Sequence, residues 1–171
     1  MPRSDYGFER TKCNCPRCSR FCGKMSGYLA PEDLDRMRMA LGGLDYISFG
    51  LEYLMASPGA TVGYQGRDGE MHHMRIHTLV PRRLEGGRCI FLEDDGKCKI
   101  HEDSPFGCAM IDEHMTDEEA NRRSLTALQD IASQNFGGPF FQIFLAYEML
   151  LAILSFHDQV AMPPEIARQG L

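Results

Sequence analysis

The sequence predicts an α-rich α+β fold, in which a small helical bundle with a short β-hairpin surrounds a loop-borne cysteine metal site. Three observations predict it. Four segments carry apolar residues at helical spacing, one segment between them resembles two strands around a glycine turn, and seven cysteines are grouped in two turn-rich clusters. At 171 residues, the chain fits a single domain over residues 1–171.

The first two helices are expected over residues 31–43 and 45–57. Pro31 suits the first position of a helix, and paired glycines suit the end of this segment. In the second segment, apolar residues recur on one helical face, and Pro58-Gly59 is expected to end it.

A β-hairpin is expected next, over residues 61–81. This stretch, TVGYQGRDGEMHHMRIHTLVP, contains a glycine-rich turn at residues 66–69 between two strand-like runs. Residues 84–108 are rich in glycine, aspartate and proline turn signals, so they are expected to form loops.

A C-terminal helical pair is expected over about residues 116–157. Thr116 and Glu119 form a capping box that predicts a helix to about residue 133, and the second helix is expected over 140–157. The apolar stretch IFLAYEMLLAILSF in the second helix has 14 residues and contains a glutamate. Because a bilayer span needs about 20 apolar residues, this stretch is expected to be a buried core helix rather than a membrane anchor.

The charge argues against two classes of partner. The formal net charge is −6, which argues against a protein that binds nucleic acids in general and against one that binds anionic membrane surfaces. Residues 1–24 differ from the rest, since they carry six basic and two acidic side chains around four thiols. The expected partner is therefore another protein, either a redox partner or an interaction partner.

The cysteines indicate a reducing compartment. The first twelve residues contain no hydrophobic run of the kind found in secretory leaders, so a cytoplasmic location is expected. Seven cysteines cannot pair completely into intramolecular disulfides. In such a setting, grouped cysteines are typical of metal binding or redox chemistry.

The cysteines fall into two clusters. The first, CNCPRCSRFC, has the spacing C-x-C-x2-C-x3-C and contains the C-x2-C knuckle that directs two sulfurs at one metal. Its C-x-C part makes it awkward for all four thiols to meet one ion, so the missing ligands are expected from the second cluster, CIFLEDDGKCKIHEDSPFGC. The predicted metal ligands are Cys13, Cys15, Cys18, Cys22, Cys89, Cys98, Cys108 and, as the eighth, His114.

These motifs resemble a family of bacterial and archaeal zinc- or iron-chelating cysteine-cluster proteins, named for a CxxCxxCC motif. The second cluster matches best. In the first, Phe21 stands where the motif has its third cysteine, and Cys13 could replace that ligand. The resemblance covers roughly residues 13–115 and implies metal binding, without implying a reaction.

Two metal types remain open. Eight ligands suffice for two closed zinc sites, or for one [4Fe–4S] cluster with thiols to spare. The compact group of cysteines with distant ligands favours an iron–sulfur cluster and an electron-transfer or redox role. The alternatives are a non-enzymatic, zinc-stabilised interaction module and a metal-dependent modifying enzyme, since flagellin lysine methylases carry similar clusters.

Nothing in the sequence identifies a catalytic residue. There is no nucleophile motif, phosphate-binding loop or H-E-x-x-H pattern. His101 is a second candidate for the eighth ligand, and the histidines of HHMRIH are weaker candidates, because an exposed strand face explains them equally well.

Overall fold

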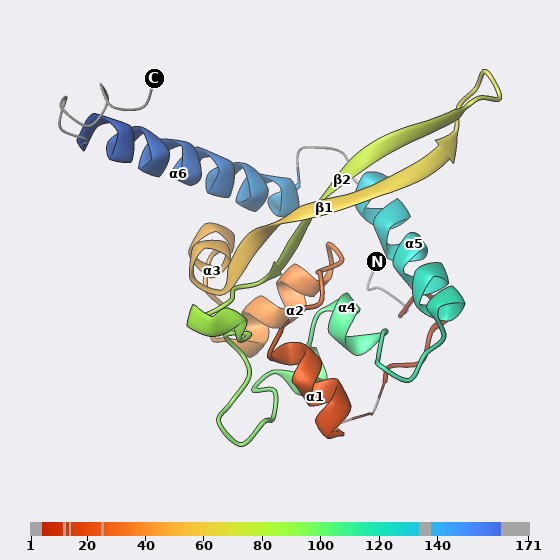
Figure 1. The fold of residues 1–171 in the computed structure, drawn as a ribbon, viewed down its shortest axis with the longest axis horizontal. Helices are drawn as coiled ribbons and strands as arrows, with labels where there is room; N and C mark the ends of the chain where they lie inside the picture. The colour runs from red at the N-terminus through yellow and green to blue at the C-terminus, as the bar shows by residue number, and fades with distance from the viewer. Residues whose placement is uncertain (1–4, 12, 14, 25, 134–137, 162–171) are drawn as a thin grey trace, which may run out of the picture.

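The computed structural model describes residues 5–11, 13, 15–24, 26–133 and 138–161, and they form an α+β fold (Figure 1). The elements in chain order are η1 (Asp5–Gly7), α1 (Pro16–Cys22), α2 (Asp33–Ala40), α3 (Tyr46–Tyr53), β1 (Leu54–Gln65), β2 (Met71–Pro81), η2 (Glu85–Gly87), η3 (His101–Asp103), α4 (Phe106–Ala109), α5 (Asp117–Ser133) and α6 (Pro139–Ala161). The mixed class agrees with the prediction, but the hairpin is too long for the fold to be described as mostly helical.

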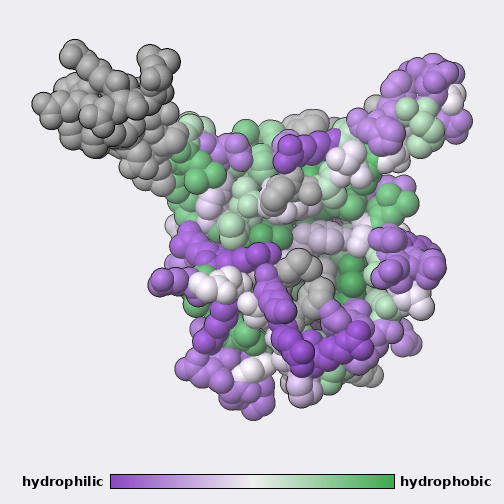
Figure 2. Space-filling view, viewed as in Figure 1, coloured by the Kyte–Doolittle hydropathy of each residue, from purple (hydrophilic) through white to green (hydrophobic). Residues whose placement is uncertain are grey.

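The two strands form one long β-hairpin. Strands β1 and β2 pair antiparallel from Leu54 opposite Pro81 to Gln65 opposite Met71. The predicted turn is confirmed, because Gly66 N–H bonds to the carbonyl of Glu70 at 2.8 Å. The far end of the hairpin projects beyond the helices in Figure 1, and Figure 2 shows that it carries mainly hydrophilic residues.

The predicted helix over residues 45–57 is wrong at its end. Helix α3 stops earlier, and the chain enters β1 at Leu54, which is fully buried and pairs with Pro81. Pro58-Gly59 does not end a helix but lies at a β-bulge, where a proline is tolerated within a strand. Pairing with β2 therefore overrides the helical spacing of this segment.

The helices cover the hairpin instead of forming a bundle of their own. Helix α6 packs against α3, β1 and β2, and α5 packs against both strands. The buried core lies between the helices and the hairpin and contains residues of both. Its side chains with 1% exposure or less include Leu29, Met37, Phe49, Leu54, Leu79 and Ile143. A smaller core under α5 is formed by Ala30, Phe106, Ala109, Met110 and Ala127.

Helix α6 is only partly the buried helix that was predicted. Its first turns bury Phe140, Ile143, Phe144 and Tyr147. Other large apolar side chains of the same helix are exposed, namely Leu145, Met149, Leu150, Leu151 and Ile153. Within the described residues, no helix combines the length and the hydropathy that crossing a bilayer requires.

Short turns organise the loop that carries the second cysteine cluster. Isolated bridges pair Arg83 with Cys89 and Leu92 with Cys98. Gly96 has a φ of 82°, a conformation that favours glycine, so the turn before Cys98 is well matched to its sequence. Cys108 departs from the predicted loop, because it lies inside the short helix α4.

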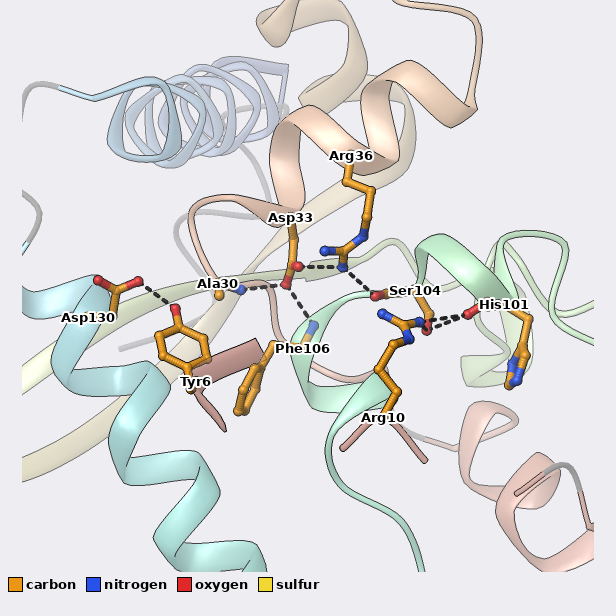
Figure 3. Close-up of polar contacts among 9 residues, drawn as sticks. All are labelled: Tyr6, Arg10, Ala30, Asp33, Arg36, His101, Ser104, Phe106 and Asp130. Atoms are coloured by element: carbon orange, nitrogen blue, oxygen red, sulfur yellow. Dashed lines mark hydrogen bonds and ion pairs between the residues drawn. The ribbon is translucent and has the colours of Figure 1, made fainter. Parts of the chain in front are cut away.

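A buried carboxylate joins helix α2 to this loop (Figure 3). Asp33 is fully buried and accepts hydrogen bonds from the backbone N–H groups of Ala30 at 2.8 Å and Phe106 at 2.7 Å. Arg36 pairs with the other carboxylate oxygen at 2.6 Å and also donates to the carbonyl of Ser104 at 2.8 Å. A buried charge without such partners is strongly destabilising, so this network fixes the position of the loop.

The N-terminal segment is held by the same region. Arg10 donates to the carbonyl of His101 at 3.1 Å and to the hydroxyl of Ser104 at 3.3 Å. Tyr6 donates to the carboxylate of Asp130 on α5 at 2.5 Å, as Figure 3 also shows. The segment that leads into the first cysteine cluster is therefore anchored to both the loop and α5.

We predict that Asp33→Asn lowers the free energy of unfolding by about 3 kcal/mol, because it leaves Arg36 without its buried partner. Urea unfolding followed by circular dichroism measures this change. Asp35→Asn is the matched control, since Asp35 lies on the same helix but is exposed, and it should change stability by less than about 1 kcal/mol. Equal losses in the two variants would contradict the role given to Asp33.

Candidate metal centre

The first cysteine cluster surrounds the start of helix α1. Cys15 precedes this helix, and Pro16 occupies its first position, where no N–H is needed. The sulfur of Cys15 accepts a hydrogen bond from the N–H of Cys18 at 3.5 Å, and its carbonyl accepts one from Ser19 at 2.9 Å. Cys15 therefore caps the helix as a serine or aspartate does, and the predicted C-x2-C knuckle is a first helical turn.

The loop after α4 brings His114 to this cluster. Thr11 donates its N–H to the carbonyl of Ala109 at 2.7 Å and its hydroxyl to the carboxylate of Asp112 at 2.6 Å. The second oxygen of Asp112 accepts the N–H of His114 at 2.8 Å, and Thr11 Oγ1 accepts the N–H of Cys13 at 3.2 Å. Asp112 thus fixes the segments that carry the cysteines and the histidine.

Cys13, Cys15, Cys18 and His114 form a compact group, which we call the Cys3His group. Their ligand atoms all lie within 4.8 Å of one another, and Cys15 Sγ is 3.3 Å from His114 Nε2. Three cysteine sulfurs and one imidazole nitrogen are a common ligand set for tetrahedral zinc. The group can therefore hold a metal ion such as zinc.

The thiols of this group differ in acidity. The N–H of Cys18, followed by the contact with His114, lowers the pKa of Cys15 to about 6. Burial, followed by the neighbouring Cys13 and Cys15, raises the pKa of Cys18 to about 12. These shifts favour the thiolate form of Cys15 and the thiol form of Cys18 at neutral pH, so a metal that binds both sulfurs would displace a proton from Cys18.

The remaining four cysteines come from three parts of the chain. Cys22 ends α1, Cys89 and Cys98 lie in the loop after the hairpin, and Cys108 lies in α4. The N–H of Cys89 donates to the carbonyl of Cys22 at 3.0 Å, which joins the two sequence clusters directly. All four residues line one cavity of about 720 Å³, which Cys13 and Cys18 also line, and we call the four the four-thiol group.

A close approach of two glycines positions Cys108. Gly107 donates its N–H to the carbonyl of Tyr28 at 2.9 Å, and Gly27 donates its N–H to Cys108 Sγ at 3.3 Å. A Cβ on Gly27 would lie 2.3 Å from the carbonyl carbon of Gly107, so no larger residue fits without a backbone shift. The glycines therefore place the Cys108 sulfur beside the segment that follows the first cluster.

The structure thus places the eight predicted ligands in two groups of four, and the spacing of the cysteines in the sequence did not indicate these groups. The Cys3His group contains Cys13, the proposed replacement for the ligand missing at Phe21, and His114, the predicted eighth ligand. Cys22 belongs with the second cluster although it follows Cys18 by one helical turn. Metal binding by all eight residues stays a prediction, since the structure shows their placement and not an ion.

Other sequence candidates have structural contacts instead. The ring of His77 packs on Phe144 with 4.4 Å between centroids, and His72 pairs with Asp68 at 3.0 Å. In the described part of the chain, no hairpin histidine belongs to a compact ligand group. Arg17, one of the basic residues within the first cluster, forms an exposed ion pair with Glu113 at 3.1 Å.

Sequence reasoning missed Thr11 and Asp112, which position the Cys3His group. The available signal was Asp112 two residues before His114, a spacing typical of a turn in which an aspartate oxygen accepts a backbone N–H. Thr11 carries no such local signal, because its partners Ala109 and Asp112 are far away in the sequence.

Comparison with protein-family models, with curated proteins and with solved structures finds no match for this chain. The resemblance to the CxxCxxCC family therefore rests on the sequence motifs alone, and the site must be interpreted from its own geometry.

We predict that Cys15 reacts first with iodoacetamide in the metal-free protein. Because its pKa is lowered to about 6, its reactivity should fall only as the pH drops below that value, whereas Cys18 should stay unreactive at neutral pH. Peptide mass spectrometry across a pH series measures the midpoint for each thiol.

The control for this prediction is His114→Ala, which should move the Cys15 midpoint upward by removing one of the contacts that favour the thiolate. A Cys15 midpoint near the unperturbed thiol value of about 8.5 in the unsubstituted protein would contradict the helix-capped geometry.

Proposed function

We propose that this protein is a metal-chelating cysteine-cluster protein and that the Cys3His group holds one zinc ion. The observation that carries the proposal is the compact set of four ligand atoms within 4.8 Å. Zinc with sulfur at about 2.3 Å and tetrahedral geometry needs ligand atoms less than about 4 Å apart, which is a small adjustment from this arrangement.

The proposed role of this zinc is structural. Four protein ligands complete a tetrahedral site and leave no open position for a substrate, which is typical of structural zinc. The ion would join the start of α1 to the loop before α5, two segments that the hydrogen bonds of Asp112 already bring together. This agrees with the zinc-stabilised, non-enzymatic module considered from the sequence.

An electron-transfer role is the second candidate function. The observation that favours it is the four-thiol group, because four further cysteines line the cavity that Cys13 and Cys18 also line, and four cysteines are the usual ligands of an iron–sulfur cluster. A redox partner protein would then supply and accept single electrons. This candidate depends on the metal bound by those four thiols, whereas the zinc proposal does not.

We predict that the purified protein contains about one zinc ion at the Cys3His group and that His114→Ala lowers zinc affinity by more than about 100-fold. Loss of a direct ligand should exceed the 10–100-fold typical of losing a residue that supports one. Competition with a chromogenic chelator measures the affinity, and elemental analysis gives the metal content.

The matched control is His72→Ala, which removes an exposed histidine of the hairpin and should leave zinc affinity unchanged. If His114→Ala and His72→Ala bind zinc as tightly as the unsubstituted protein, the Cys3His group is not the zinc site.

A further inference from the structure

Helix α6 extends beyond the body of the protein before it ends (Figure 1). Its first part packs on α3 and the hairpin and buries four residues between Phe140 and Tyr147. From Glu148 to Ile153, by contrast, every residue is exposed. Six consecutive residues pass around the whole circumference of a helix, because one turn takes 3.6 residues. This part of α6 is therefore exposed on all sides.

The exposed part of α6 is apolar, whereas a solvated helix is normally polar. From Pro139 to Ile153 the sequence contains one charged residue, Glu148. The large apolar side chains of this stretch that are 39% to 65% exposed are Leu145, Met149, Leu150, Leu151 and Ile153. A helix that is apolar on all faces is normally buried, so α6 has the composition of a helix that another surface covers.

Three of these side chains form a continuous stripe. Leu145, Met149 and Ile153 follow one another at intervals of four residues, so they lie along one face of the helix. At about 100° per residue, this face points away from Ile143 and Tyr147, which pack α6 against the body. We call the three residues the α6 stripe. Because it faces away from the core of its own chain, only a second molecule can cover it.

The exposed area is close to the area that a dimer requires. At on the order of 200 Å² for a fully exposed residue of this size, the five side chains leave roughly 500 Å² of mainly apolar surface in water. Monomeric proteins rarely expose a contiguous apolar patch larger than a few hundred Å². Two copies would bury about 1,000 Å² from these residues alone, which approaches the ~1,200 Å² at which stable interfaces begin.

The charge of α6 favours a second copy over a lipid surface. Helices that lie on membranes carry lysine and arginine on their polar face, but α6 has neither from Pro139 to Ala161. The net charge of −6 adds repulsion from anionic lipids. An uncharged stripe is complementary to an identical uncharged stripe, and interfaces between identical subunits are the more apolar class.

We propose that two copies of this chain associate about a two-fold axis, with the α6 stripes of the two copies packed antiparallel against each other. Met149 then lies near the axis, and Leu145 lies opposite Ile153 of the second copy. Rows of side chains four residues apart interdigitate readily in helix pairs. Glu148 is about 100° from Met149 around the helix, so it lies at the edge of the interface, in water.

This dimer goes beyond the proposed zinc site and does not depend on it. The α6 stripe shares no residue with the Cys3His group or the four-thiol group. Loss of zinc binding and loss of self-association can therefore be measured separately.

The test is sedimentation velocity of the full chain over a concentration series, in reducing buffer that excludes disulfide-linked dimers. We expect a concentration-dependent shift to twice the mass of one chain, with a micromolar dissociation constant, because the interface is of modest area. Met149→Glu should weaken this association by at least about 100-fold, since it places a charge in an apolar interface.

Met71→Glu is the matched control. Met71 is 63% exposed, close to the 65% of Met149, but it lies at the start of β2 beside the hairpin turn. The substitution adds the same charge and should leave the dissociation constant unchanged. Both side chains are exposed, so neither substitution disturbs the core, and circular dichroism verifies that both variants fold.

A single copy throughout the concentration series would overturn the proposal, as would association that Met149→Glu leaves intact. Equal weakening by Met149→Glu and Met71→Glu would also overturn it, because net charge rather than the α6 stripe would then control association. Binding of the single-copy protein to phosphatidylcholine vesicles would identify a lipid surface as the occupant of α6 and contradict the dimer.

Discussion

The carboxylate of Asp33 is the interaction on which the arrangement of thiols depends. It accepts hydrogen bonds from Ala30, which follows the first cysteine cluster, and from Phe106, which precedes Cys108. A buried carboxylate needs all its partners, and here they come from segments more than seventy residues apart in the sequence. The hydrogen bonds to this one carboxylate therefore hold the two sequence clusters close together. Gly27 and Gly107, which place the Cys108 sulfur, are in contact as a consequence.

Helix α1 divides the first cluster between two groups. Its N-terminus, with Cys15 as the cap, faces the loop that carries His114, whereas Cys22 at its C-terminus bonds through its carbonyl to Cys89. One short helix thus links the Cys3His group, whose ligand atoms lie within 4.8 Å of one another, to the four-thiol group, and residues of both groups line the same cavity.

The sequence predicted those features that local chemistry determines. Thr116 caps α5 as expected, since its hydroxyl accepts the N–H of Glu119, and the glycine turn of the hairpin lies where it was predicted. Long-range contacts were beyond such reasoning. Leu54 lies in a strand because β2 pairs with it, and the grouping of Cys22 with Cys89 depends on a backbone bond between distant segments.

The central claim is that the proposed zinc ion lies in the Cys3His group, and anomalous diffraction from crystals grown anaerobically tests it most directly. Data collected on both sides of the zinc and iron absorption edges locate each element separately. The account predicts a zinc peak among Cys13, Cys15, Cys18 and His114. Iron in place of zinc at this group, or sulfurs joined as disulfides with no metal, would contradict it.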